Sequence, residues 1–186
     1  MPFYIGGVIA CVKKQKEVFT GYLKELILNV SLEENGWKRT HKNALRDAVR
    51  LLSKTDRKEE TLLLLSDLVV HTASHVRSVI VALLDALVIV LHSEEVVKRV
   101  LPALVTLSAD PDPAVRLEAI QALGLVAVNV EDPIVLEKVK TQFESFIEDD
   151  SHNHRVTITK VFTNMIPHVQ AHFRDHCKWK FHGNFD

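Results

Sequence analysis

The sequence predicts an all-α fold, an α-solenoid of about four two-helix repeats with a period of 39 residues. Three observations predict it. A basic residue recurs at this period in four places: Lys38, Arg77, Arg116 and Arg155. Apolar residues recur in the same register in several columns, among them Leu26, Leu65, Leu104 and Phe143, and Leu45, Leu84, Leu123 and Phe162. Within each period the apolar positions lie three and four residues apart, which is the spacing of one face of an α-helix.

The composition agrees with a helical array. The 186 residues are 47% hydrophobic and include only six glycines and six prolines. A chain dominated by aliphatic residues, with few turn formers, favours packed helices over an all-β fold. No linker rich in Pro, Gly or Ser interrupts the sequence, so we expect residues 1–186 to form a single array.

The repeats are predicted in chain order from the register. Residues 5–12 would be the last helix of a preceding repeat, because Ile9 lies 39 residues before Ala48. Four repeats follow at about 16–53, 60–91, 94–130 and 133–170. The predicted helix pairs are 16–30 with 39–53, 60–71 with 75–91, 94–108 with 113–129, and 133–148 with 153–170. Residues 171–186 lose the pattern and are predicted as an irregular tail. Because the first predicted helix belongs to a preceding repeat, we interpret the chain as a fragment of a longer array.

The stretch SADPDPAVR at 108–116 predicts the turn between two helices of one repeat. Pro111 ends the first helix, because the residue before a proline avoids the α region. Asp112 can cap the second helix, and Pro113 suits its first position, where the missing N–H is not needed. We expect Val115 to point inward, and Arg116 to contact acidic groups or carbonyls of the neighbouring unit.

A two-helix unit of this length, with an Asp-Pro turn and a nearby arginine, resembles a HEAT repeat. The resemblance implies that neighbouring units bury their apolar faces against one another and stack into a superhelix, so we expect contacts only between neighbouring units. It also implies a concave binding surface and a role as a protein-binding scaffold.

Cysteine content and hydropathy bear on where the chain works. Cys11 and Cys177 are too few for a disulfide framework and suit a reducing compartment, so a cytoplasmic location is expected. The longest apolar run, residues 79–91, contains Asp85 and is shorter than the roughly 20 residues of a membrane span. We therefore predict no transmembrane segment.

The charge distribution excludes a general nucleic-acid binder. Residues 1–60 carry a balance of +4, residues 61–150 carry −8, and residues 151–186 carry +3. A nucleic-acid binder would present one dominant basic face, whereas this chain has an acidic middle. No nucleic-acid partner is predicted.

Catalytic motifs are missing from the sequence. It contains no phosphate-binding loop, no G-x-G-x-x-G and no H-E-x-x-H. Ser66, Asp67 and His71 would lie along one helix without the nucleophile elbow of a hydrolase. We predict a protein that is not an enzyme and that needs no cofactor.

Two groups of histidines have a spacing that a metal could use. They are His71 with His75, and His168, His172 and His176 with Cys177. The register puts the first pair across a turn and ends a helix near His168, so neither group would share one continuous helix face. A zinc or copper site on the second group stays an alternative, but we predict no metal.

A series of cations is the candidate binding site. Lys38, Lys42, Arg46 and Arg50 recur every four residues on one predicted helix and would form an exposed strip. An ordinary solvated helix face explains this pattern. The functional alternative is peripheral contact with an anionic membrane or an acidic partner, where each cation adds about 1 kcal/mol near a charged membrane.

Several stretches go beyond a generic HEAT array. They are YIGGVIACV, TGYLKELIL, VVHTASHVRS, VLPALVTLSADPDPAVR, VKTQFESFIEDD and HFRDH, in this order. Together they resemble the C-terminal region of the Rab-binding family of proteins that combine a LisH motif, a coiled coil and HEAT repeats. The likeness covers most of residues 4–176 and transfers no residue-level binding motif.

The family resemblance carries functional expectations. It implies a Rab GTPase effector that tethers recycling endosomes to the trans-Golgi network and supports intracellular cholesterol transport with an oxysterol-binding protein. It also implies a location at the periphery of these two compartments. The alternative is a HEAT-type regulatory or scaffold subunit of a larger enzyme or nuclear complex.

Overall fold

The computed structural model describes residues 2–32, 37–148, 152–169, 171 and 174–175. Over these residues it is all-helical and contains no strand, which confirms the predicted fold class. The elements are α1 Pro2–Val12, α2 Lys16–Leu32, α3 Trp37–Leu52, α4 Lys58–Leu68, α5 Ser74–Val88, α6 Ser93–Glu95, the π-helix η1 Val96–Val100, α7 Leu101–Ser108, α8 Pro113–Asn129, α9 Pro133–Ile147 and α10 His152–Met165.

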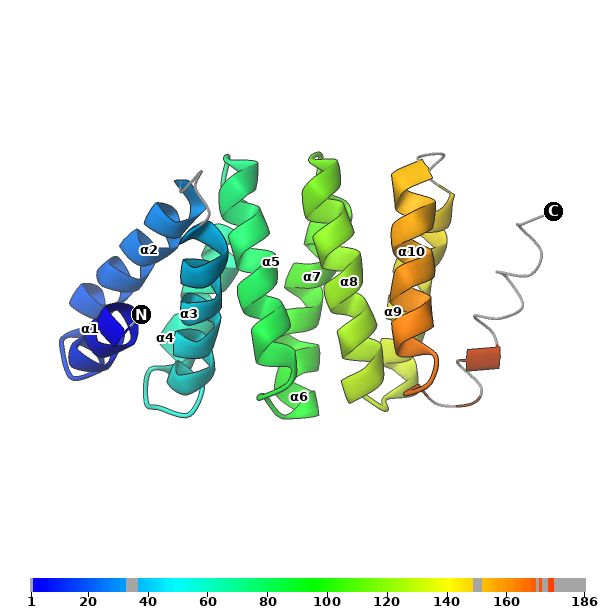
Figure 1. Ribbon diagram of the computed structural model, residues 1–186. Helices are drawn as coiled ribbons and strands as arrows, with labels where there is room; N and C mark the ends of the chain where they lie inside the picture. The colour runs from blue at the N-terminus through cyan, green and yellow to red at the C-terminus, as the bar shows by residue number, and fades with distance from the viewer. Residues whose placement is uncertain (1, 33–36, 149–151, 170, 172–173, 176–186) are drawn as a thin grey trace.

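The helices form two rows (Figure 1). The helices α3, α5, α8 and α10 stand side by side, and we call them the B helices. Their partners α2, α4, α7 and α9 are the A helices, and α1 packs against α2 and α3 at one end. Each B helix packs against the B helix that follows it. This is the arrangement of an α-solenoid, although the division into four repeats stays a prediction.

The predicted core columns are buried. One column joins A helices and comprises Leu26, Leu65, Leu104 and Phe143, with exposed fractions of 8%, 0%, 0% and 2%. The column of Leu45, Leu84, Leu123 and Phe162 is 1%, 2%, 0% and 4% exposed. The two phenylalanines meet edge to face, with ring centroids 5.1 Å apart. The period therefore marks the residues that hold the two rows together.

Some helix ends differ from the prediction. Helix α8 has the predicted bounds, but α4 ends at Leu68 and α5 at Val88, each three residues early. Helix α10 was predicted to reach residue 170 and ends at Met165. Pro167 explains this end, because it lacks an N–H and keeps the residue before it out of the α region.

The helix predicted at 94–108 is continuous but irregular. It begins with α6, widens into the π-helix η1 and continues as α7. Pro102 lies at the start of α7 and cannot donate a backbone hydrogen bond to the preceding turn. A π turn next to this proline accommodates the missing donor. The periodicity of apolar residues cannot reveal a π turn, in which each backbone hydrogen bond spans one residue more than in an α-helix.

The glycine pair near the N-terminus allows a close helix contact. A Cβ atom at Gly7 would collide with the Tyr22 hydroxyl of α2, whereas Gly6 has open space. The side chain of Arg57 links the end of α1 to the segment before α4, because its Nε donates to the Val12 carbonyl at 2.9 Å. The guanidinium also lies 5.6 Å from the ring centroid of Phe19.

Among the helices of the described ranges, none is both long and apolar enough to cross a bilayer.

Candidate binding surface on the B helices

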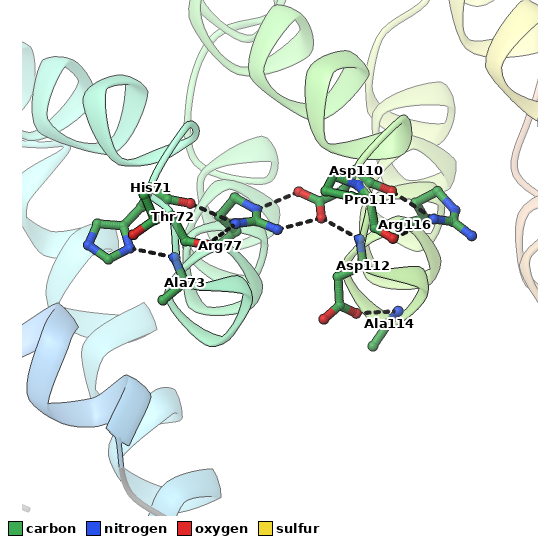
Figure 2. Close-up of polar contacts among 9 residues, drawn as sticks. All are labelled: His71, Thr72, Ala73, Arg77, Asp110, Pro111, Asp112, Ala114 and Arg116. Atoms are coloured by element: carbon green, nitrogen blue, oxygen red, sulfur yellow. Dashed lines mark hydrogen bonds and ion pairs between the residues drawn. The ribbon is translucent and has the colours of Figure 1, made fainter.

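The turns between A and B helices set the spacing of the B helices. Arg77, at the start of α5, is 8% exposed, and its carboxylate partner Asp110 is 6% exposed. Arg77 Nε and Nη2 donate to Asp110 Oδ2 and Oδ1 at 2.6 and 2.7 Å. Arg77 Nη1 donates to the carbonyls of His71 and Thr72 at 2.6 and 3.1 Å. Figure 2 shows the guanidinium between its own turn and the next one, so a single side chain joins two repeats.

The following turn repeats the contacts that Arg77 makes with the carbonyls of its own turn. Arg116 Nη1 donates to the carbonyls of Asp110 and Pro111 at 2.7 and 3.2 Å, as Figure 2 shows. These carbonyls belong to its own unit, and Arg116 has a further interaction besides them, so its expected contact with the neighbouring unit stays a prediction. The equivalent Arg77 makes that contact. Asp112 caps α8 as predicted, by accepting from the Ala114 N–H at 2.9 Å.

The carboxylates of the turn have shifted pKa values. Burial raises the pKa of Asp110, but the hydrogen bonds from Arg77 and from the Asp112 N–H outweigh it, so the net pKa is lowered. The pKa of Asp112 is lowered chiefly by a hydrogen bond from Ser74 and by the Ala114 N–H. Both carboxylates are therefore held in their ionised form by contacts that exist only in the folded chain.

These shifts predict acid sensitivity. A carboxylate whose folded pKa lies below its ordinary value of 3.8 stabilises the fold above that value. This stabilisation is lost as the pH falls through the folded pKa values. We expect the free energy of unfolding, measured by urea titration, to decrease below about pH 4. Asp112→Asn should make the decrease shallower, whereas the exposed control Asp67→Asn should leave its slope unchanged. An identical slope in Asp112→Asn would contradict this assignment.

The predicted strip of cations lies on α3 and is part-buried. The side chain of Lys38 is outside the described residues. Those of Lys42, Arg46 and Arg50 are 23%, 29% and 30% exposed, so they do not form the exposed strip that we expected. Arg50 donates to Asp47 at 3.0 Å and to the Ala86 carbonyl of α5 at 3.3 Å. The strip faces the next B helices as well as solvent.

Two acidic side chains on the following B helices form ion pairs with cations of the strip. Arg46 Nη2 donates to Asp85 Oδ2 of α5 at 2.5 Å. Lys42 Nζ lies 3.6 Å from Glu118 Oε1 of α8, and Glu118 also accepts from Ser78 Oγ at 2.7 Å. Burial raises the pKa of Asp85 more than Arg46 and the other cations lower it. The acids neutralise much of the charge of α3.

The Lys42–Glu118 pair corrects one expectation. We expected contacts only between neighbouring units, but this salt bridge joins the first repeat to the third. The two side chains line a hollow of about 180 Å³ together with Val81 and Ala82 of α5. Small side chains on α5 let the long lysine reach past it. The Arg46–Asp85 pair next to it had a signal in the sequence, because the two residues lie 39 positions apart, which is one period.

A larger hollow of about 470 Å³ adjoins the first one, because Asp85 and Gln121 line both. It lies where α8 and α10 meet, and its other lining residues come mainly from these two helices. They include Gly124, Leu125, Val128, Val161, Lys160 and Asn164. The B helices therefore present a charged region on α3 and α5 and a mostly apolar hollow between α8 and α10.

Among the described residues, the histidine and serine candidates are not brought together into a site. His71 Nδ1 accepts from the Ala73 N–H at 3.1 Å, as Figure 2 shows, and His75 is exposed. Ser66 Oγ donates to the Leu62 carbonyl of its own helix at 2.9 Å. His168 is exposed, while His172, His176 and Cys177 lie outside the described residues. In the ranges that are described, no three His, Cys, Asp or Glu side chains are placed to hold a metal.

Comparison with known proteins decides the family. The model of the family described as the RAB11-binding protein RELCH C-terminal domain matches residues 1–181. The chain belongs to the RELCH family. This confirms the family resemblance predicted from the quoted stretches. The match to the RELCH model extends over the whole of the two-row array.

Individual RELCH proteins agree with the family match. The RAB11-binding protein RELCH homolog of Danio rerio is 32% identical over 182 residues, which is 94% of this chain and 15% of the relative. The Homo sapiens RAB11-binding protein RELCH has the same identity and coverage. This chain thus spans about 15% of the length of these RELCH relatives. An engineered protein of known crystal structure has a TM-score of 0.47 at 15% identity, over 89% of this chain and 63% of that chain.

Proposed function

We propose that this chain is a non-enzymatic scaffold module that takes part in binding a RAB11-type GTPase. The observation that carries the proposal is the match of a RAB11-binding protein's C-terminal domain to residues 1–181. The B helices supply a suitable surface, because charged side chains and an apolar hollow lie next to each other on them. Protein interfaces combine these two kinds of surface, an apolar centre and a polar rim.

The proposal extends to the cellular role that the family resemblance implies. In it, the chain works in the cytoplasm, at the periphery of recycling endosomes and the trans-Golgi network, as part of a tether that supports cholesterol transport. An oxysterol-binding protein is the proposed second partner. The alternative, a subunit of a larger enzyme or nuclear complex, has no observation in its favour beyond the HEAT-like architecture.

Nucleotide-dependent capture tests the proposal. The immobilised chain is incubated with purified RAB11 loaded either with a non-hydrolysable GTP analogue or with GDP. We expect preferential capture of the GTP form, because an effector recognises the active state of its GTPase. Equal capture of both forms, or of neither, would contradict an effector role for this region. Recovery of a phosphatase catalytic subunit or of chromatin proteins would instead favour the alternative.

Membrane contact through the strip is a further part of the proposal. We expect the chain to co-sediment with phosphatidylserine-rich liposomes at 10 mM salt and to be released at 1 M salt, where the Debye length falls from about 30 Å to about 3 Å. Lys42→Glu should weaken this binding, because Lys42 holds Glu118 only loosely at 3.6 Å. Arg46 is left intact, because it donates to Asp85 at 2.5 Å and its replacement would deprive this part-buried carboxylate of that hydrogen bond.

The matched control for this experiment is Lys138→Glu on α9, an exposed cation on an A helix. It makes the same change in net charge on a different row. Equal losses in Lys42→Glu and Lys138→Glu would show a non-specific charge effect. Absence of co-sedimentation at low salt would remove the membrane role of Lys38, Lys42, Arg46 and Arg50 altogether.

A further inference from the structure

The hollow between α8 and α10 has an apolar floor. Gly124 of α8 lies against α10 so closely that a Cβ atom there would be 2.7 Å from Val161 Cγ1. Val161 and Met165 of α10 are 7% and 2% exposed, and Leu125 of α8 is half-buried. The close approach at Gly124 brings these side chains together beneath one hollow of about 470 Å³. An aliphatic side chain of a ligand would replace water over the half-buried Leu125 and Val128 of α8.

The rim of this hollow is polar and carries an unpaired cation. Lys160 of α10 is exposed, and in the described part of the chain no acidic side chain pairs with it. Gln121, Asn164 and His168 also lie on the rim and are exposed. Asp85 is the one acid among the described residues that line this hollow, and it is already bonded to Arg46. The charge left for a ligand is therefore positive.

The backbone around the hollow favours a helical ligand. The walls are α-helices, whose N–H and C=O groups are bonded within each helix. An extended peptide would find no row of backbone partners here, in contrast to a peptide that binds at the edge of a β-sheet. A helix satisfies its own backbone and can place side chains three and four residues apart along a groove between two other helices.

We infer that the hollow between α8 and α10 is a docking groove for an amphipathic helix of a protein partner, with aliphatic side chains over Gly124 and Leu125 and a carboxylate on Lys160. This inference rests on the proposed function, since a scaffold module acts by binding proteins, and it assigns one of the binding surfaces. A basic partner would be repelled by Lys160 and would have to displace Arg46 from Asp85. An acidic partner needs no existing salt bridge to break.

Titration with a synthetic peptide tests the groove. The probe is a capped helical peptide of about 20 residues, with leucines on one face and glutamates flanking them. Its matched control replaces every glutamate with lysine. Binding is measured by chemical-shift changes of the backbone amides of the isotopically labelled chain. We expect saturable shifts at Gln121, Gly124 and Asn164 with the glutamate peptide, and at least about tenfold weaker binding of the lysine peptide.

Two variants of the chain locate the binding. Lys160→Glu should weaken the glutamate peptide about tenfold and reverse the preference between the two peptides, because the rim charge changes sign. Asn164→Trp should weaken both peptides by filling the hollow. Lys138→Glu on α9 carries the same charge change away from the groove and should bind as the unmodified chain does. Because Lys160 and Asn164 are exposed, we expect both variants to fold. An unchanged circular dichroism spectrum checks this.

Three results would overturn the groove. They are no saturable shift up to about 1 mM of the glutamate peptide, shifts confined to the A helices, or equal effects of Lys160→Glu and Lys138→Glu. Capture of GTP-loaded RAB11 by the same chain is measured separately. Failure of the peptide titration with intact RAB11 capture therefore overturns the groove alone, whereas loss of RAB11 capture overturns the proposed function.

Discussion

Replacing Arg77 with alanine is expected to lower the free energy of unfolding by about 3–5 kcal/mol. Arg77 is buried, and its guanidinium holds both oxygens of Asp110 and two carbonyls of its own turn. Its removal leaves the Asp110 carboxylate buried without a counter-charge, and the lost stability is mainly the cost of that isolated charge. Urea unfolding followed by circular dichroism at pH 7 measures the change.

An exposed ion pair gives the control for Arg77. Arg99 pairs with Glu59 at 2.9 Å, but the two side chains are 36% and 55% exposed. Water screens this pair, so Arg99→Ala should cost less than about 1 kcal/mol. Arg77→Lys keeps the charge but loses the two parallel hydrogen bonds, and we expect an intermediate cost. If Arg77→Ala and Arg99→Ala were equally mild, the turn would not be the joint between repeats.

Truncation of Leu104 to alanine is expected to cost about 2–5 kcal/mol. Leu104 lies on α7, is 0% exposed, and belongs to the core between α7 and α8. The cost combines the lost burial of the side chain with the cavity that remains, since rigid neighbouring helices collapse only partly into it. Thermal and urea unfolding both report it.

Leu63 provides a matched leucine for this comparison. It lies on α4 and is 45% exposed, so Leu63→Ala should change the stability by no more than about 0.5 kcal/mol. A thermal midpoint that is unchanged in Leu104→Ala would show that the 39-residue register does not mark the core. A large loss in Leu63→Ala would show that the outer side of α4 is covered by another surface.

The sequence alone determined the fold class and the core register. The spacing of apolar residues indicates which side of each helix is buried. The same buried positions recur every 39 residues, as the burial of Leu65 and Leu104 shows. The turn at Asp112 and Pro113 was also predictable, because capping and the proline position depend on residues within a few positions of each other. The π turn next to Pro102 and the early end of α10 fell outside that pattern.

The tertiary structure decided most of the charge pairs, although the 39-residue interval between Arg46 and Asp85 was visible in the sequence. Sequence placed Arg77 near a turn, but only stacking of the repeats shows that its partner is Asp110, 33 residues further on. The cations of α3 read as an exposed strip, yet the next B helices bring Asp85 and Glu118 against Arg46 and Lys42. The hollow between α8 and α10 is likewise invisible in sequence. Local patterns encode the helices and their buried sides, whereas pairs and hollows between helices depend on how far one helix is turned and shifted against the next.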